Sequence, residues 1–99
     1  MLNDFINWAK SVAASQFRVA IEMRVTVGNA SDNPSARLDV DTPSAVARIT
    51  CWESGDYELE VIDIDSEKQI FAQGGKVETG ALLSEQFRSF FEMLGIAIE

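Results

Sequence analysis

The stretch Trp52-Glu-Ser-Gly-Asp-Tyr-Glu-Leu-Glu-Val-Ile-Asp-Ile-Asp65 contains the clearest turn and the clearest strand in this chain. From residue 57 onward the side chains alternate between two faces. One face receives Tyr57, Leu59, Val61 and Asp63, and the other receives Glu58, Glu60, Ile62 and Ile64. Such alternation in a segment with β-branched and aromatic residues predicts a half-buried strand. The turn Glu53-Ser-Gly-Asp56 is expected to join it to the apolar segment before it as an antiparallel hairpin.

Outward from this hairpin, the periodicity changes between extended and helical. Apolar residues recur at helical spacing near both ends of the chain, and the segments between them alternate or are bounded by turn residues. Asn3 or Asp4 would cap the first helix, Thr79 or Ser84 would cap the last, and Gly95 would end it. The predicted elements are a helix over 2–17, strands over 18–27 (with 18–22 fitting either helix or strand), 37–41, 45–52, 57–65 and 69–73, a bend at 74–75, and a helix over 83–94.

Together these elements predict an α+β fold. It consists of an N-terminal helix, a meander of four or five antiparallel strands and a C-terminal helix, in a single domain over residues 1–99. Both helices are expected on one face of the sheet, which buries that face and leaves the other to water. Trp8, Cys51 and the C-terminal phenylalanines are expected to pack in the core. Alternation then places Glu58 and Glu60 on the open surface.

Charge is unevenly distributed along the chain. Sixteen acidic and eight basic residues give a formal net charge of -8, and between Asp39 and Glu67 there are nine acids and one base, Arg48. A phosphate backbone and an anionic membrane surface would both be repelled, so the composition argues against nucleic-acid and membrane partners. Two interpretations remain. The acidic segment is a solvated face that maintains solubility, or it meets the basic surface of another protein.

Several kinds of catalytic or metal site are disfavoured by the residue types present. The chain has no histidine and one cysteine, so the commonest general base is absent and a multi-cysteine zinc site cannot form. The segment Asp63-Ile-Asp-Ser-Glu67 lacks the glycine of a calcium-binding loop. We therefore expect no enzyme activity, no metal and no cofactor. Because no apolar run is long enough to span a membrane and the N-terminus lacks signal-peptide features, we expect a cytoplasmic protein.

Recognition of another protein is the function that these patterns favour. Clustered carboxylates accelerate the encounter with a basic partner, and aromatic or aliphatic side chains among them slow dissociation. The candidate partner-binding carboxylates are Asp39, Asp41, Glu53, Asp56, Glu58, Glu60, Asp63 and Asp65. The candidate apolar anchors are Trp52, Tyr57, Ile62 and Ile64.

The run from Ser35 to Asp65 resembles the TriTu family, small immunity proteins of bacterial polymorphic-toxin systems. The resemblance is carried by a strand that ends Ala-Arg-Ile-x-x-Trp-Glu-x-Gly, at residues 47–55, and by a following strand that ends Val-Ile-Asp, at residues 61–63. A Phe-x-x-Trp element in the first helix, Phe5 to Trp8, is similar as well. These segments span about two-thirds of the chain.

The resemblance implies a cytoplasmic antidote to a type VI-secreted Rhs effector. In that family the toxin is an ADP-ribosyltransferase that modifies elongation factor Tu, and the immunity protein binds the catalytic domain and blocks its active site. A monomer in a 1:1 complex is expected, and the family supplies no catalytic residues. Three alternatives stay open: a DNA mimic that inhibits a nuclease, a chaperone or adaptor for a secreted effector, and a small enzyme.

Overall fold

A computed structural model describes residues 1–15, 20–78 and 80–98 of the chain and confirms the α+β architecture. The helices are α1 (Leu2–Ser15), α2 (Leu83–Gln86) and α3 (Arg88–Leu94). The strands are β1 (Glu22–Val27), β2 (Ser35–Asp41), β3 (Ala45–Trp52), β4 (Asp56–Asp63) and β5 (Gln69–Lys76).

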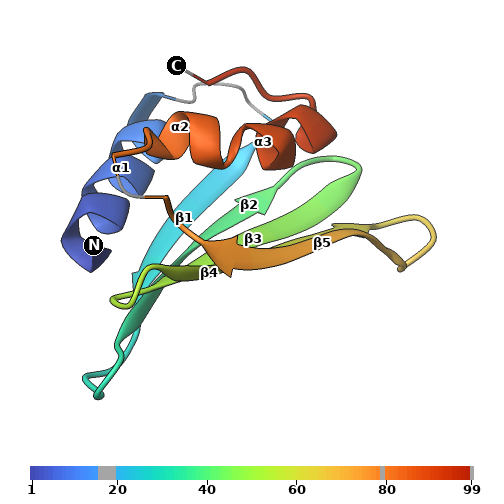
Figure 1. Cartoon of the computed structure of the whole chain (residues 1–99). Helices are drawn as coiled ribbons and strands as arrows, with labels where there is room; N and C mark the ends of the chain where they lie inside the picture. Colours follow the sequence, from blue (N-terminus) through green and yellow to red (C-terminus); the bar gives the residue numbers. More distant parts are fainter. Residues whose placement is uncertain (16–19, 79, 99) are drawn as a thin grey trace.

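The five strands form one sheet whose spatial order, β1-β2-β3-β4-β5, is also the order of the sequence. All neighbouring strands are antiparallel. Short turns join them, as expected for a meander in which consecutive strands pair. Figure 1 shows the twisted sheet with all three helices on one of its faces. The predicted placement of the helices is therefore confirmed.

The core lies between the helices and the sheet. Alternate residues of β2, β3 and β4 point into it, which follows from the period of two along a strand. From α1 the core receives Leu2, Phe5, Ala9 and Val12, which lie on one stripe of the helix. The sheet contributes Ala36, Leu38, Val40, Ala45, Ala47, Ile49, Cys51, Tyr57, Leu59 and Val61. The C-terminal segment contributes Phe87, Phe90, Phe91 and Ile96.

Cys51 is fully buried in this core, as predicted. Burial disfavours the charged thiolate and raises the pKa of the thiol from 9.0 to about 11. The thiol therefore stays neutral at physiological pH, which suits a packing residue and not a nucleophile.

The first helix begins at Leu2, before both of its predicted capping residues. Because α1 starts at Leu2, Asn3 and Asp4 lie inside its first turn. The Leu2 N–H instead donates to Glu53 Oε2 at 3.1 Å, and the Met1 amino group lies 3.6 Å from Glu53 Oε1. The turn between β3 and β4 thus supplies an anionic acceptor to the helix N-terminus, where the helix dipole favours it.

The predicted C-terminal helix is two short helices, divided at Phe87. This residue has φ -106° and ψ 18°, outside helical values, and its ring enters the core. Its centroid lies 6.3 Å from that of Phe5, 5.5 Å from that of Trp8 and 5.2 Å from that of Tyr57. The division places an aromatic ring against residues of both α1 and β4. Gly95 ends α3 in the left-handed conformation with φ 70°, as predicted.

The predicted caps of that C-terminal segment do not have this role in the described residues. The N-cap position of α2 is Leu82, with no side-chain capping bond, and Ser84 lies inside the helix. Thr79 is outside the described residues.

Strand boundaries differ from the prediction in four strands. β2 begins at Ser35 and not at residue 37, and β4 begins at Asp56 and not at Tyr57. β4 ends at Asp63, so Ile64 and Asp65 belong to the turn that follows. β5 continues through Gly74 and Gly75 to Lys76, and the irregularity lies earlier, where the pairing register shifts between Val61 and Ile62. β1 begins at Glu22 and not in the segment 18–21, of which 18 and 19 are outside the described residues.

Candidate protein-binding face

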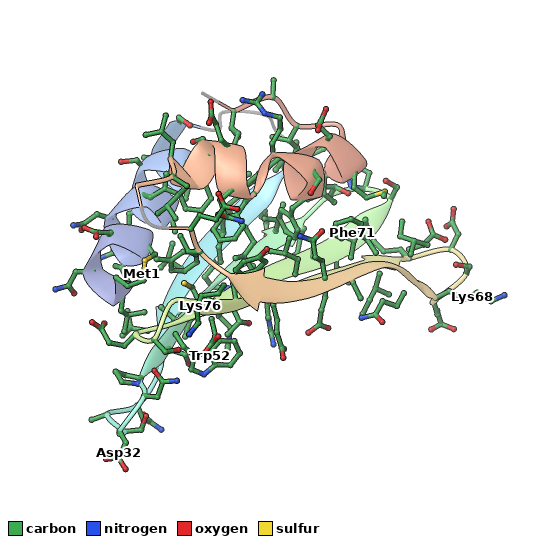
Figure 2. The ribbon with its side chains drawn as sticks, viewed as in Figure 1. Met1, Asp32, Trp52, Lys68, Phe71 and Lys76 are labelled. Atoms are coloured by element: carbon green, nitrogen blue, oxygen red, sulfur yellow. The ribbon has the colours of Figure 1, made fainter. Side chains whose placement is uncertain are left out.

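The sheet has a second face that no described helix covers, and we call it the open face. It consists of the residues of β1 to β5 whose parity is opposite to that of the core residues. Its charged members are Glu22, Arg24, Arg37, Asp39, Asp41, Arg48, Asp56, Glu58, Glu60 and Lys76. Its larger apolar members are Val46, Trp52 and Ile62. Figure 2 shows Trp52 on the side of the sheet away from the helices.

Strand register arranges these side chains in rows across the sheet. One row contains Arg24, Asp39, Arg48 and Glu60, so its charge alternates in sign. The adjacent row contains Glu22, Asp41, Val46 and Ile62. Directly opposite residues of antiparallel strands are close enough to interact, so each row is a continuous strip of surface. A depression of about 610 Å³ lies over the middle of both rows and is lined by residues of β1, β2, β3 and β4.

Asp39 lies at the centre of this depression and holds two arginines. Its Oδ1 accepts a hydrogen bond from Arg48 Nε at 2.7 Å, and its Oδ2 accepts one from Arg37 Nε at 3.2 Å. The Asp39 side chain is 17% exposed, so it orients both guanidinium groups while remaining largely covered by them. Arg24 lies opposite Asp39 on β1. Among the described residues, nothing forms an ion pair with Arg24.

These arginines are the part of the surface that sequence reasoning missed. The sequence predicts acids and apolar anchors as the partner-binding residues, and Arg48 stands out in it only as the one base within an acidic segment. Alternation within residues 18–27 did place Arg24 on the polar side of its strand. What the sequence lacked was the register, which brings Arg24 and Arg37 beside Arg48 from other strands.

Three of the six acids of the open face lie on β4. Glu58 is exposed and Glu60 is half-buried, and neither forms an ion pair within the described part of the chain. Asp41 on β2 is half-buried at the edge of the same depression. Ile62 pairs with Val46, which is 38% exposed, and together they make a small apolar patch beside the charged row. Of the predicted residues, the structure therefore brings together Asp39, Asp41, Glu58, Glu60 and Ile62.

Tyr57 was predicted as a surface anchor, and the structure corrects this. It is 5% exposed and lies on the helix-covered face, because it has the parity of Leu59 and Val61. The side-chain amides of Gln73 and Gln86 donate to its hydroxyl oxygen at 3.3 and 3.4 Å. Its polar end is thus satisfied within the molecule, and its ring packs in the core.

Three further predicted residues lie around the β3–β4 turn and do not line the depression. Trp52 is half-buried at the end of β3. Asp56 is exposed and accepts a hydrogen bond from Ser54 Oγ at 2.6 Å, with Lys76 Nζ 3.8 Å away. The carboxylate of Glu53 is occupied by the N-terminus of α1. Glu53 therefore has an intramolecular role that the charge pattern did not reveal.

The remaining predicted residues form the β4–β5 turn at the opposite end of the strands. Asp63 Oδ2 accepts a hydrogen bond from the Ser66 N–H at 2.9 Å, and this contact lowers the pKa of the carboxyl group. Ile64 is 43% exposed, and Asp65 is exposed. Figure 2 shows Lys68 at the tip of this turn, which projects away from the helices. Asp63, Ile64 and Asp65 thus lie outside the depression.

Two further features of the described residues concern burial and metal binding. None of their polar or charged side chains is fully buried, and no three histidine, cysteine or carboxylate side chains among them are arranged to hold a metal ion. No helix within residues 1–15, 20–78 and 80–98 combines the length and the apolar content needed to cross a membrane. The charged rows and the apolar patch of the open face are suited to recognition by salt bridges, hydrogen bonds and apolar contact.

Comparison with known protein families gave a match over nearly the whole chain. A family model described as "Immunity protein TriTu" matches residues 3–93. That range includes all of the sheet, the open face and most of the helical layer. The comparison with curated proteins gave no match.

Proposed function

The chain belongs to the TriTu family of immunity proteins, and from that premise we propose that it neutralises its cognate toxin by docking the open face onto it. An immunity protein has a toxin as its partner, so the question is which surface the partner covers. The observation that carries the proposal is the asymmetry of the sheet. Helices bury one face, and the other presents a depression lined by charged and apolar side chains.

This surface has the composition of a protein-binding site. Val46 and Ile62 form an apolar patch, and charged side chains of β1 to β4 lie beside it. Interfaces commonly combine an apolar centre with a polar rim that supplies hydrogen bonds and orientation. The surface also lies on strands, which hold its side chains in a fixed register and reduce the ordering cost of binding.

The finer part of the proposal concerns the toxin. We infer an ADP-ribosyltransferase that modifies elongation factor Tu, delivered as a type VI-secreted Rhs effector, whose active site is occluded in a 1:1 complex in the cytoplasm. The resemblance of residues 35–65 to the family supports this inference. The net charge of -8 supports it as well, because a toxin that binds NAD and modifies a protein presents basic groups that an acidic surface can cover.

Inhibition in this proposal requires binding alone. An interface near the standard size of roughly 1,600 Å² would be sufficient for a stable complex. The acids of β4, Glu58 and Glu60, would speed encounter with basic groups of the toxin, and the apolar patch would slow dissociation. The three arginines on the same face disfavour the DNA-mimic alternative, since a mimic of the phosphate backbone presents continuous negative charge.

A titration of enzymatic activity tests the proposal. The catalytic domain of the cognate toxin is incubated with NAD, elongation factor Tu and increasing amounts of the immunity protein, and ADP-ribosylation is measured. Activity should fall linearly to zero at equimolar immunity protein. Loss of modification at a small fraction of one equivalent would indicate catalytic reversal, and the binding mechanism would then be wrong. A complex that leaves the toxin active would favour the chaperone or adaptor alternative.

A further inference from the structure

We propose that Arg24, Arg37 and Arg48 form a receptor for an acidic side chain of the toxin. This inference rests on the proposed docking of the open face and deepens it. The arginines of the open face, and not only its acids, then take part in binding the toxin. The toxin side chain would enter the depression over β1, β2 and β3, while the acids of β4 meet basic groups of the toxin beside it.

The geometry around Asp39 prepares two of the three arginines for such a contact. Asp39 bonds only the Nε atoms of Arg37 and Arg48, at 3.2 and 2.7 Å. Among the described residues, no hydrogen bond engages the terminal amino groups of either guanidinium. A guanidinium held through Nε presents its terminal N–H groups as a planar donor pair, which matches the two oxygens of a carboxylate. Asp39 is in this sense a positioning residue.

Arg24 completes the receptor from the neighbouring strand. It lies opposite Asp39 in the β1–β2 register and lines the same depression. It is exposed, and within the described residues it has no ion pair. Three of the eight basic residues of the chain therefore meet on one small surface of a protein whose net charge is -8. If the open face only attracted a basic partner, these arginines would repel that partner and weaken the binding.

A single carboxylate fits this surface better than a polyanion. Asp41 and Glu60 line the depression together with Asp39, so three acids balance the three arginines. The depression has no net charge with which to attract a phosphate backbone from a distance. A carboxylate placed directly among the guanidinium groups would still gain short charge-assisted hydrogen bonds. The alternation of sign also requires a partner with charges of both signs in matching positions, which provides specificity.

The test reverses one charge of the protein and measures its affinity for the catalytic domain of the cognate toxin. Arg24→Glu is the principal variant, because its loss breaks no ion pair with a described residue. Arg48→Glu is the second, and Arg88→Glu on the exposed surface of α3 is the matched control with the same change of net charge. Dissociation constants are measured by calorimetry at low and moderate salt, and thermal unfolding checks that each variant remains folded.

The direction in which the affinity of the arginine variants changes distinguishes an acid receptor from attraction by the acids alone. With an acid receptor, Arg24→Glu should weaken binding about tenfold and Arg48→Glu should weaken it more, while Arg88→Glu leaves it within about twofold. A toxin variant in which the recognised acid is changed to lysine should restore binding to Arg24→Glu. If the acids of the open face alone attract the toxin, Arg24→Glu and Arg48→Glu would bind it with an unchanged dissociation constant or would associate with it faster.

Failure of this inference and failure of the proposed function have different signatures. Unchanged or faster binding of both arginine variants, together with weakened binding of Glu58→Lys, would overturn the acid receptor and retain the docking face. Unchanged affinity for every open-face variant would overturn the docking face, and the receptor with it. Absence of any complex between the wild-type protein and the toxin domain would overturn the proposed function itself.

Discussion

The two faces of the sheet are built from the same five strands and have opposite chemistry. The helix-covered face carries Leu38, Ile49, Leu59 and Val61, each no more than 1% exposed. The open face carries arginines and carboxylates in rows, with a small apolar patch beside them. Because side chains alternate along each strand, one set of positions determines the fold and the intervening set determines the surface. The partner specificity of such a sheet can therefore change without disturbing its core.

Truncation in the helix-covered face should have the largest effect on stability. Phe87→Ala removes a buried ring that contacts three other aromatic rings, and it should lower the free energy of unfolding by about 3–5 kcal/mol. Urea denaturation measures this loss, which is large beside the total of about 5–15 kcal/mol typical of small proteins. Glu58→Ala on the open face is the control and should change stability by less than about 0.5 kcal/mol. Equal losses for the two variants would contradict the division of roles.

Charge reversal on the open face should weaken toxin binding while the protein stays folded. The double variant Glu58→Lys, Glu60→Lys should raise the dissociation constant for the toxin by about tenfold to a hundredfold, mainly through slower association, while the protein stays folded. Surface plasmon resonance at several salt concentrations measures both rates. The matched control is Glu85→Lys, Glu92→Lys, which makes the same change of net charge on exposed positions of α2 and α3. If both double variants lose affinity equally, net charge and not the open face is responsible.

Within the β3–β4 hairpin, Glu53 should contribute to stability and not to toxin binding. Its carboxylate contacts the N-terminus of α1, so Glu53→Gln should lower the free energy of unfolding by about 0.5–1 kcal/mol and leave toxin affinity unchanged. Thermal unfolding and calorimetry on the same sample distinguish these outcomes. Weaker toxin binding with unaltered stability would instead return Glu53 to the partner-binding surface, where the charge pattern had placed it.

Asp63 should have the smallest effect, and one that depends on pH. Its hydrogen bond from the Ser66 N–H lowers the carboxyl pKa from the usual 3.8, so its contribution to stability is present above that pH. As the pH falls through the lowered pKa the carboxylate is protonated and the contribution is lost. The Tm of the wild type should exceed that of Asp63→Asn at about pH 6, and the two values should converge towards about pH 2. A constant difference would exclude the ionised carboxylate as the cause.

Much of this arrangement followed from local patterns in the sequence. The alternation in residues 57–63 predicted which side chains of β4 turn inward, and the helical spacing near both ends predicted the covering layer. The same alternation already put Tyr57 with Leu59. The prediction of Tyr57 as a surface anchor was wrong, because its parity places its side chain on the helix-covered face.

The rest depended on contacts between distant segments. Strand register brings Arg24 and Arg37 beside Arg48, and no pattern within a single strand encodes it. The contact of Glu53 with Leu2 joins positions far apart in the chain. The division of the last helix at Phe87 reflects aromatic packing against α1 and β4, which overrides an otherwise continuous helical periodicity. Such features arise from tertiary packing, and local propensity does not determine them.

Carboxyl-group footprinting of the complex tests the central claim, that the toxin covers the open face, most directly. Free and toxin-bound protein are labelled at carboxylates through carbodiimide coupling, and mass spectrometry reports the modification at each residue. Docking through the open face predicts that Asp41, Glu58 and Glu60 lose most of their labelling in the complex while Glu85 and Glu92 on the helices keep theirs. Protection of the helical pair, with the open-face carboxylates labelled as in the free protein, would contradict the claim.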